Sequence, residues 1–124
     1  MEAYEALKMA IDMADENYRT NKDDSYFSVF YAHKKKRLEK VLSQVENRMC
    51  MGFLLRELKQ ERLRFVDLSK EEAAHPTFDW YGEHYWEIVY DGKAAGCEAA
   101  IGILESALDQ RDIGDSDDTK SKKQ

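Results

Sequence analysis

Apolar side chains recur at helical spacing along most of the chain, and this pattern predicts three main helices. A spacing of three and four residues is typical of an amphipathic helix with one buried stripe. Over 2–19 this stripe is Tyr4, Leu7, Ile11, Ala14 and Tyr18. The same spacing predicts a long helix over 25–66 and a third over 83–111. The predicted fold is a single all-α domain over 1–111, a long antiparallel helical hairpin with an additional N-terminal amphipathic helix.

The apolar stripe of the long helix changes face near Gly52. Before this point it follows Phe27, Tyr31, Leu38, Leu42, Val45 and Met49, and after it follows Met51, Leu55, Leu58 and Phe65. A glycine inside a helix costs about 1 kcal/mol relative to alanine. Either the helix bends near Gly52 or an additional face is buried there, and the pattern alone leaves both open.

The third helix has a row of small residues in addition to its apolar stripe. Gly92, Gly96 and Ala100 follow one another at steps of four. A row without side-chain bulk lets another helix approach closely, so we expect these residues to contact a partner helix. Residues 112–124 are almost wholly polar and are predicted to form a disordered tail.

Length and composition restrict the class of protein. A chain of 124 residues fits one domain. No apolar stretch reaches the length of a membrane span, and the N-terminus lacks the basic start and apolar run of a Sec signal peptide. The expected location is cytoplasmic, with export beside a partner, independent of a Sec signal, as the alternative.

Charge is distributed unevenly within the net charge of −6. The middle of the chain is basic and both flanks are acidic, so a hairpin would set a basic helix against an acidic one. Its densest basic run contains Lys34, Lys35 and Lys36, which we expect to face an acidic helix of this chain or of a partner. The overall acidity makes nucleic acid an unlikely main ligand.

The best candidate for catalytic chemistry is an acidic row with a histidine beside it. Glu83, Glu87 and Asp91 are four residues apart, next to His84, and such a row could bind a divalent cation if a second helix offered matching groups. No second row exists, so a solvated acidic face is favoured. Cys50 and Cys97 are expected to be packing thiols. We predict no catalytic, cofactor or metal site, no small-molecule substrate and no enzyme activity.

The segment between the two long helices has the most specific pattern. It reads Trp80-Tyr81-Gly82, and Ile88 follows six positions after the glycine. This arrangement resembles the Trp-x-Gly helical-hairpin proteins of type VII secretion, over about residues 25–111. In that family the tryptophan packs across the hairpin turn and the glycine lets the chain reverse closely. The resemblance therefore implies a buried Trp80, whose replacement by alanine would cost about 3 to 5 kcal/mol, and a strained or closely approached Gly82.

The resemblance also implies a function. Proteins of this kind that are encoded beside exported toxins act by helix pairing, so the chain is expected to be an adaptor, chaperone or co-targeting factor of a type VII secreted toxin, in a homodimer or with a helical protein partner. The alternative is an acidic helical inhibitor of a host protein, encoded by a phage or mobile element. The expected partner-binding residues are Trp80, Gly82, Ile88, Gly92, Gly96, Ala100, Lys34, Lys35 and Lys36.

Overall fold

Four helices make up most of the structure. The computed structural model describes residues 2–78, 80, 82 and 84–120, with side chains as far as Asp109. The helices are α1 (Ala3–Thr20), α2 (Phe27–Glu46), α3 (Met51–Ala74) and α4 (Tyr85–Lys120). These described residues contain no strand, which confirms the all-α prediction. None of their helices has both the length and the apolar character needed to cross a membrane.

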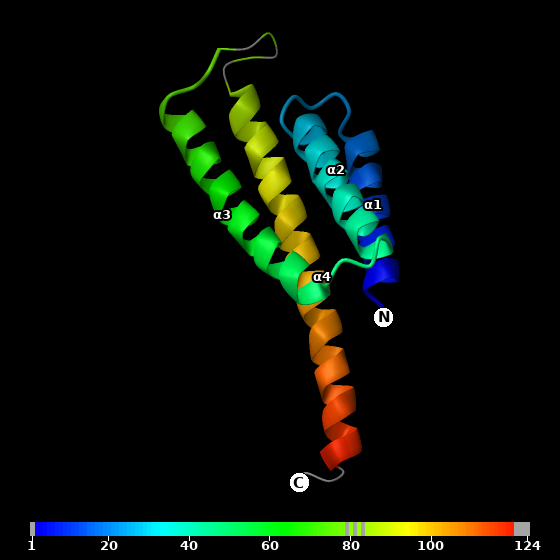
Figure 1. Cartoon of the computed structure of the whole chain (residues 1–124). Coiled ribbons are helices and arrows are strands. Elements are labelled where there is room, and N and C mark those ends of the chain that lie inside the picture. Colours follow the sequence, from blue (N-terminus) through cyan, green and yellow to red (C-terminus); the bar gives the residue numbers. More distant parts are fainter. Residues whose placement is uncertain (1, 79, 81, 83, 121–124) are drawn as a thin grey trace.

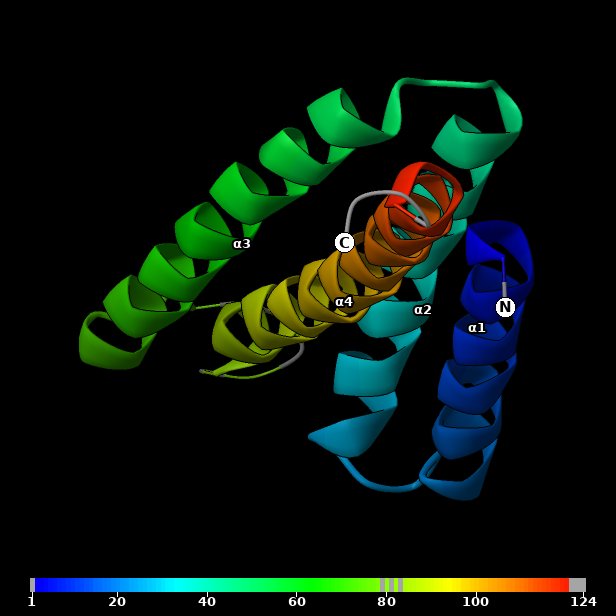
Figure 2. The same cartoon turned by 90° about the horizontal axis from the view of Figure 1, so that it is seen from below.

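The helices lie side by side, with α4 between α3 and α2 (Figures 1 and 2). Both neighbours pack extensively on α4, and α1 packs on the far side of α2 with a smaller contact to α4. The C-terminal part of α4 extends past the ends of the other helices (Figure 1). The apolar core draws on all four helices: Ala3, Leu7, Ile11 and Ala14 of α1, Leu38 and Val41 of α2, Leu54 and Leu58 of α3, and Cys97, Ala100 and Leu104 of α4.

The prediction of one helix over 25–66 is wrong, because the chain forms two helices there. Helix α2 ends at Glu46, and two residues later Arg48 has a left-handed conformation, with φ of 61°. The Arg48 N–H donates to the Val45 carbonyl and the Met49 N–H donates to the Gln44 carbonyl. This pair of bonds is a Schellman motif, which satisfies the last carbonyls of a helix and reverses the chain. The changed apolar face therefore reflects a second helix that packs on another side of α4, and Gly52 lies in its first turn.

Helix α4 also differs from its prediction. It continues to Lys120, whereas a helix ending at Arg111 and a disordered tail over 112–124 were predicted; residues 121–124 of that tail lie outside the described part. No proline interrupts 112–120, and extending an existing helix costs far less than starting one. Polar composition alone therefore did not predict where the helix ends.

Ion pairs with Asp15 join α1 to α2. Its Oδ1 accepts a hydrogen bond from Lys35 Nζ at 2.8 Å, and its Oδ2 pairs with Arg19 one turn along α1. The Lys35 hydrogen bond, assisted by the charges of Arg19 and Lys35, lowers the pKa of the Asp15 carboxyl below its ordinary value of 3.8.

The low pKa of Asp15 predicts how stability depends on pH. A carboxyl whose pKa is depressed by folding stabilises the folded state above its unfolded pKa, and this contribution is lost as pH falls through the folded pKa. We therefore expect Asp15→Asn to melt at a lower temperature than wild type at pH 7, with the difference shrinking as the pH falls below 3.8 and through the lowered pKa of the folded protein. Circular dichroism melts across pH test this, and a difference that grows on acidification would contradict it.

Candidate partner-binding surface

The connection of α1 to α2 and the connection of α3 to α4 lie at the same end of the molecule (Figure 1), and exposed aromatic residues lie in or next to both. Tyr26 and Phe27 at the start of α2 are 38% and 42% exposed. On the α3–α4 connection, Phe78 is 87% and Trp80 96% exposed. We call these four residues the loop-end surface. Because large aromatic side chains are rarely left this open in isolated soluble domains, the loop-end surface is the main candidate for protein contact.

A cavity lies beside this surface. Its volume is about 360 Å³, and it is formed between the starts of α2 and α4. Val29 and Ile88 give it apolar walls, while Ser25, Ser28 and His84 bring polar atoms. The full lining is Ser25, Ser28, Val29, Gly82, His84, Tyr85 and Ile88. An aromatic or aliphatic side chain of a partner could fill this space.

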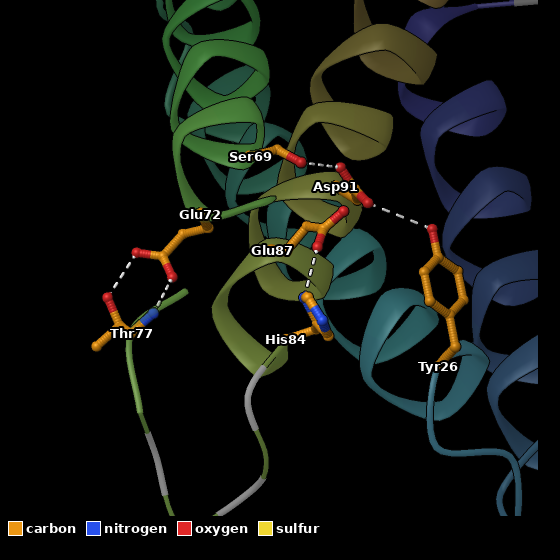
Figure 3. Close-up of polar contacts among 7 residues, drawn as sticks. All are labelled: Tyr26, Ser69, Glu72, Thr77, His84, Glu87 and Asp91. Carbon is orange, nitrogen blue, oxygen red and sulfur yellow. Dashed lines mark hydrogen bonds and ion pairs between the residues drawn. The ribbon is translucent and has the colours of Figure 1, made fainter. Parts of the chain in front are cut away.

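Hydrogen bonds from two helices fix the start of α4 through Asp91 (Figure 3). The Ser69 hydroxyl of α3 donates to Asp91 Oδ1, and the Tyr26 hydroxyl of α2 donates to Asp91 Oδ2 at 3.4 Å. Burial, followed by the negative charge of Asp91, raises the pKa of Tyr26 above its ordinary value of 10.0. Tyr26 therefore remains a neutral donor at physiological pH, and one carboxylate links three helices beneath the loop-end surface.

The start of the α3–α4 connection is fixed in a similar way. Thr77 donates to the carboxylate of Glu72 from its backbone N–H at 2.9 Å and from its hydroxyl at 2.8 Å (Figure 3). His84 Nδ1 lies 3.1 Å from Glu87 Oε1. These bonds tie both ends of the connection to the adjoining helices.

The described residues of the acidic row do not gather into a metal site. Asp91 bonds hydroxyls and Glu87 contacts His84, while Glu83 lies outside the described residues. Among the side chains that the structure describes, no group of three or more His, Cys, Asp and Glu could hold a metal ion.

Trp80 does not pack across the turn, contrary to the prediction. Its side chain is 96% exposed. The two helices are held together at this end by Ser69 and Asp91 and by stacking of Phe65 on Tyr90, with ring centroids 6.3 Å apart. These contacts hold the turn without a buried tryptophan. The free energy of unfolding is therefore not expected to fall by about 3 to 5 kcal/mol in Trp80→Ala, because that cost applies to a buried side chain.

Gly82 has the positive φ expected for the chain reversal, at 123°. A Cβ added there would meet nothing within 4 Å, so the reason for glycine is backbone conformation alone and not close contact. Ile88, six positions later, is half-buried in the wall of the cavity.

The row of small residues on α4 is used inside the chain. A Cβ at Gly92 would lie 2.5 Å from the carbonyl oxygen of Phe30, and one at Gly96 would lie 2.7 Å from Cβ of Arg37. Ala100 is fully buried in the core. The close helix approach was therefore correctly expected, but α2 is the helix that approaches, and the three residues are covered.

The three lysines of the basic run do not share one environment. Lys35 pairs with Asp15 of α1, and the backbone carbonyl of Lys34 would lie 3.0 Å from a Cβ at Gly96. Lys36 lines a cavity between α2, α3 and α4. The run therefore meets an acidic helix of its own chain at Lys35 and does not form one continuous docking patch.

The two cysteines differ in environment. Cys50, just before α3, is exposed, and the amide groups of Phe53 and Gly52 lower the pKa of its thiol. Cys97 is buried, and its burial raises the thiol pKa. Cys97 thus has the packing role expected of it, whereas Cys50 does not lie in the core.

Sequence reasoning missed Phe78, and assigned Phe27 to the core stripe of the long helix. The signal for Phe78 was an aromatic residue in a polar connection, two residues after Pro76. Comparison with protein-family models, with curated proteins and with solved structures gave no match.

Proposed function

We propose that this chain is a helical protein-binding adaptor, a chaperone or co-targeting factor of a type VII secreted toxin, which acts by helix pairing. The observation that supports this function best is the exposed Trp80, two residues before Gly82, which lines the cavity together with Ile88. Tryptophan is the residue most enriched among energetically dominant contacts of protein interfaces. The same three positions carry the resemblance to the Trp-x-Gly proteins, and here they lie together at one end of the bundle.

The partner contact is assigned to the loop-end surface and its cavity. A helix of the partner would lay apolar side chains across Phe27 and Trp80 and insert one of them beside Ile88. The pairing differs from the one expected from the row of small residues, because that row is occupied by α2. A second copy of this chain remains the simplest alternative partner.

The inhibitor alternative has less support. It requires free carboxylates for charge mimicry of an acidic ligand. Two carboxylates of α4 already pair with α3, Glu98 with Arg62 at 3.8 Å and Glu105 with Lys59 at 2.9 Å. Two of the acidic residues of α4 therefore have partners on α3 of the same chain, so no external partner is needed to explain their presence.

Trp80→Ala separates binding from folding. Because the side chain is 96% exposed, we expect the free energy of unfolding to stay within about 0.5 kcal/mol of wild type, while affinity for the partner falls by tenfold or more. The matched control is Leu63→Ala on α3, also apolar and 57% exposed, which should change neither property. Urea unfolding measures stability, and quantitative co-purification from the native host measures binding.

The identity of the captured protein decides between the functions. A toxin with a helical segment, lost with Trp80→Ala and kept with Leu63→Ala, supports the adaptor. A host enzyme that binds through the acidic face of α4 supports the inhibitor. A compact monomer in light scattering that binds no apolar dye and no partner would contradict both.

A further inference from the structure

A second cavity, of about 510 Å³, opens between α2, α3 and α4. It shares no lining residue with the cavity beside Ile88. Its volume is within the range of sites for small ligands. The lining is His33, Lys36, Arg37 and Lys40 of α2, Glu61, Arg64, Phe65 and Leu68 of α3, and Lys93 of α4.

The charge of this lining is opposite to that of the whole chain. Five lysine and arginine side chains and one carboxylate face the cavity, in a protein with a net charge of −6. That carboxylate, Glu61, already pairs with Arg37. Concave walls of low dielectric concentrate the field of such a cluster. A strong positive potential therefore remains inside the cavity.

Arg37 is the buried member of the cluster. Its side chain is only 7% exposed, and its Nη2 pairs with Glu61. Its Nη1 is buried and has no hydrogen-bond partner in the described part of the chain. A buried donor without a partner costs free energy. Because Nη1 is shielded from solvent, Arg37 contributes its positive charge to the cavity and not this donor.

The neighbouring groups confirm that the positive charges are crowded. Burial, then the charges of Lys36 and Lys93, lower the pKa of His33. Lys93 lies over the Phe65 ring, with Nζ 5.6 Å from its centroid. The like charges that line this one cavity repel one another, and a bound anion would reduce the repulsion.

We propose that this cavity binds the polyphosphate group of a small molecule, a diphosphate or triphosphate. The guanidinium group of Arg64 matches phosphate oxygens in a planar fork, and Lys36 and Lys93 supply ammonium contacts from two different helices. The excess of positive charge fits several phosphate charges better than one carboxylate. The hollow is lined by three helices and open to solvent, and the net charge of −6 over the whole chain disfavours an extended nucleic acid as its ligand.

Isothermal titration of the full chain in chloride buffer tests the proposal, with inorganic pyrophosphate, ATP and adenosine as probes. Pyrophosphate and ATP should bind, and Lys36→Gln and Lys93→Gln should each weaken binding about tenfold, because each removes one charge-assisted contact. The matched control is Lys70→Gln, an exposed lysine of α3 that does not line the cavity. It should bind as wild type does. Circular dichroism melts establish that each variant is folded.

The outcomes distinguish a phosphate site from unspecific charge attraction and from nucleic-acid binding. Equal affinity for pyrophosphate and ATP means that the site recognises the phosphates alone, while tighter binding of ATP than of pyrophosphate means that the nucleoside also contributes; both support the proposal. Absence of pyrophosphate binding overturns it. So does an equal loss of affinity in all three lysine variants, which would indicate unspecific charge attraction. Single-stranded DNA that binds more tightly than either phosphate, and is weakened by Lys70→Gln, would instead assign the basic surface to nucleic acid.

Discussion

Gly92→Val is expected to lower the free energy of unfolding by about 3 kcal/mol, at the upper end of the usual cost of overpacking. A Cβ at this position would lie 2.5 Å from the carbonyl oxygen of Phe30 and 3.1 Å from Cβ of His33. The carbonyl belongs to the backbone of α2 and cannot rotate away as a side chain can. Helix α2 would have to move from α4, which would open the core contacts between them. Urea unfolding followed by circular dichroism measures the change.

Two alanine substitutions give the matched comparison. Helix propensity alone predicts that glycine to alanine inside a helix stabilises by about 1 kcal/mol. At Gly102 a Cβ would meet nothing within 4 Å, so Gly102→Ala should gain stability up to this amount. Gly92→Ala should lose stability in spite of the same propensity gain. If both variants became more stable by equal amounts, the close contact of α2 with α4 would be refuted.

The same row of glycines shows how far the sequence could predict the packing. Three small residues at steps of four identified the face of α4 that another helix approaches. They carried no information about which helix this is, because any helix backbone fits against a row without side chains. The turn at Arg48 separates α2 from α3, and both helices then pack on α4. The helix that approaches the small residues of α4 is therefore known only from the tertiary structure.

The turn between α2 and α3 was not predicted, because its left-handed residue is not a glycine. Helices that end in a left-handed residue usually have glycine there, and the glycine of this region, Gly52, lies four residues later in the first turn of α3. Arg48 takes the left-handed conformation instead. The change of apolar face therefore did indicate a change in the helix. Because Gly52 was taken as its position, the prediction placed it four residues too late and did not identify the turn at Arg48.

The candidate surface was only partly predictable. Trp80 and Ile88 were identified from their pattern, but periodicity does not determine whether a tryptophan on a connection faces inward or outward. Trp80 is 96% exposed, and α3 and α4 are joined instead by contacts between Ser69 and Asp91 and between Phe65 and Tyr90. Likewise the basic cavity joins residues of three helices, and only the tertiary fold brings Lys93 beside His33 and Lys36.

Removal of Glu61 is expected to destabilise the fold by about 3 to 5 kcal/mol, the usual cost of leaving a buried charge without its partner. Arg37 is 7% exposed and its Nη2 pairs with Glu61, while its Nη1 has no partner in the described chain. In Glu61→Ala the guanidinium would keep its charge and lose this contact. The measurement is urea unfolding in chloride buffer without phosphate, so that no phosphate ion takes the place of the carboxylate.

A double-mutant cycle identifies the cause of this loss. Arg37→Met should cost less than Glu61→Ala, because the carboxylate it leaves behind is 22% exposed and can be hydrated. Arg37→Met combined with Glu61→Leu replaces both charges by apolar groups of similar length and should restore stability to within about 1 kcal/mol of wild type, because buried ion pairs often equal their apolar substitutes. If the double variant were as unstable as Glu61→Ala, the loss would come from packing and not from charge. A change below about 0.5 kcal/mol in Glu61→Ala would mean that the guanidinium reaches water, and Arg37 would then not be the buried member of the basic cavity.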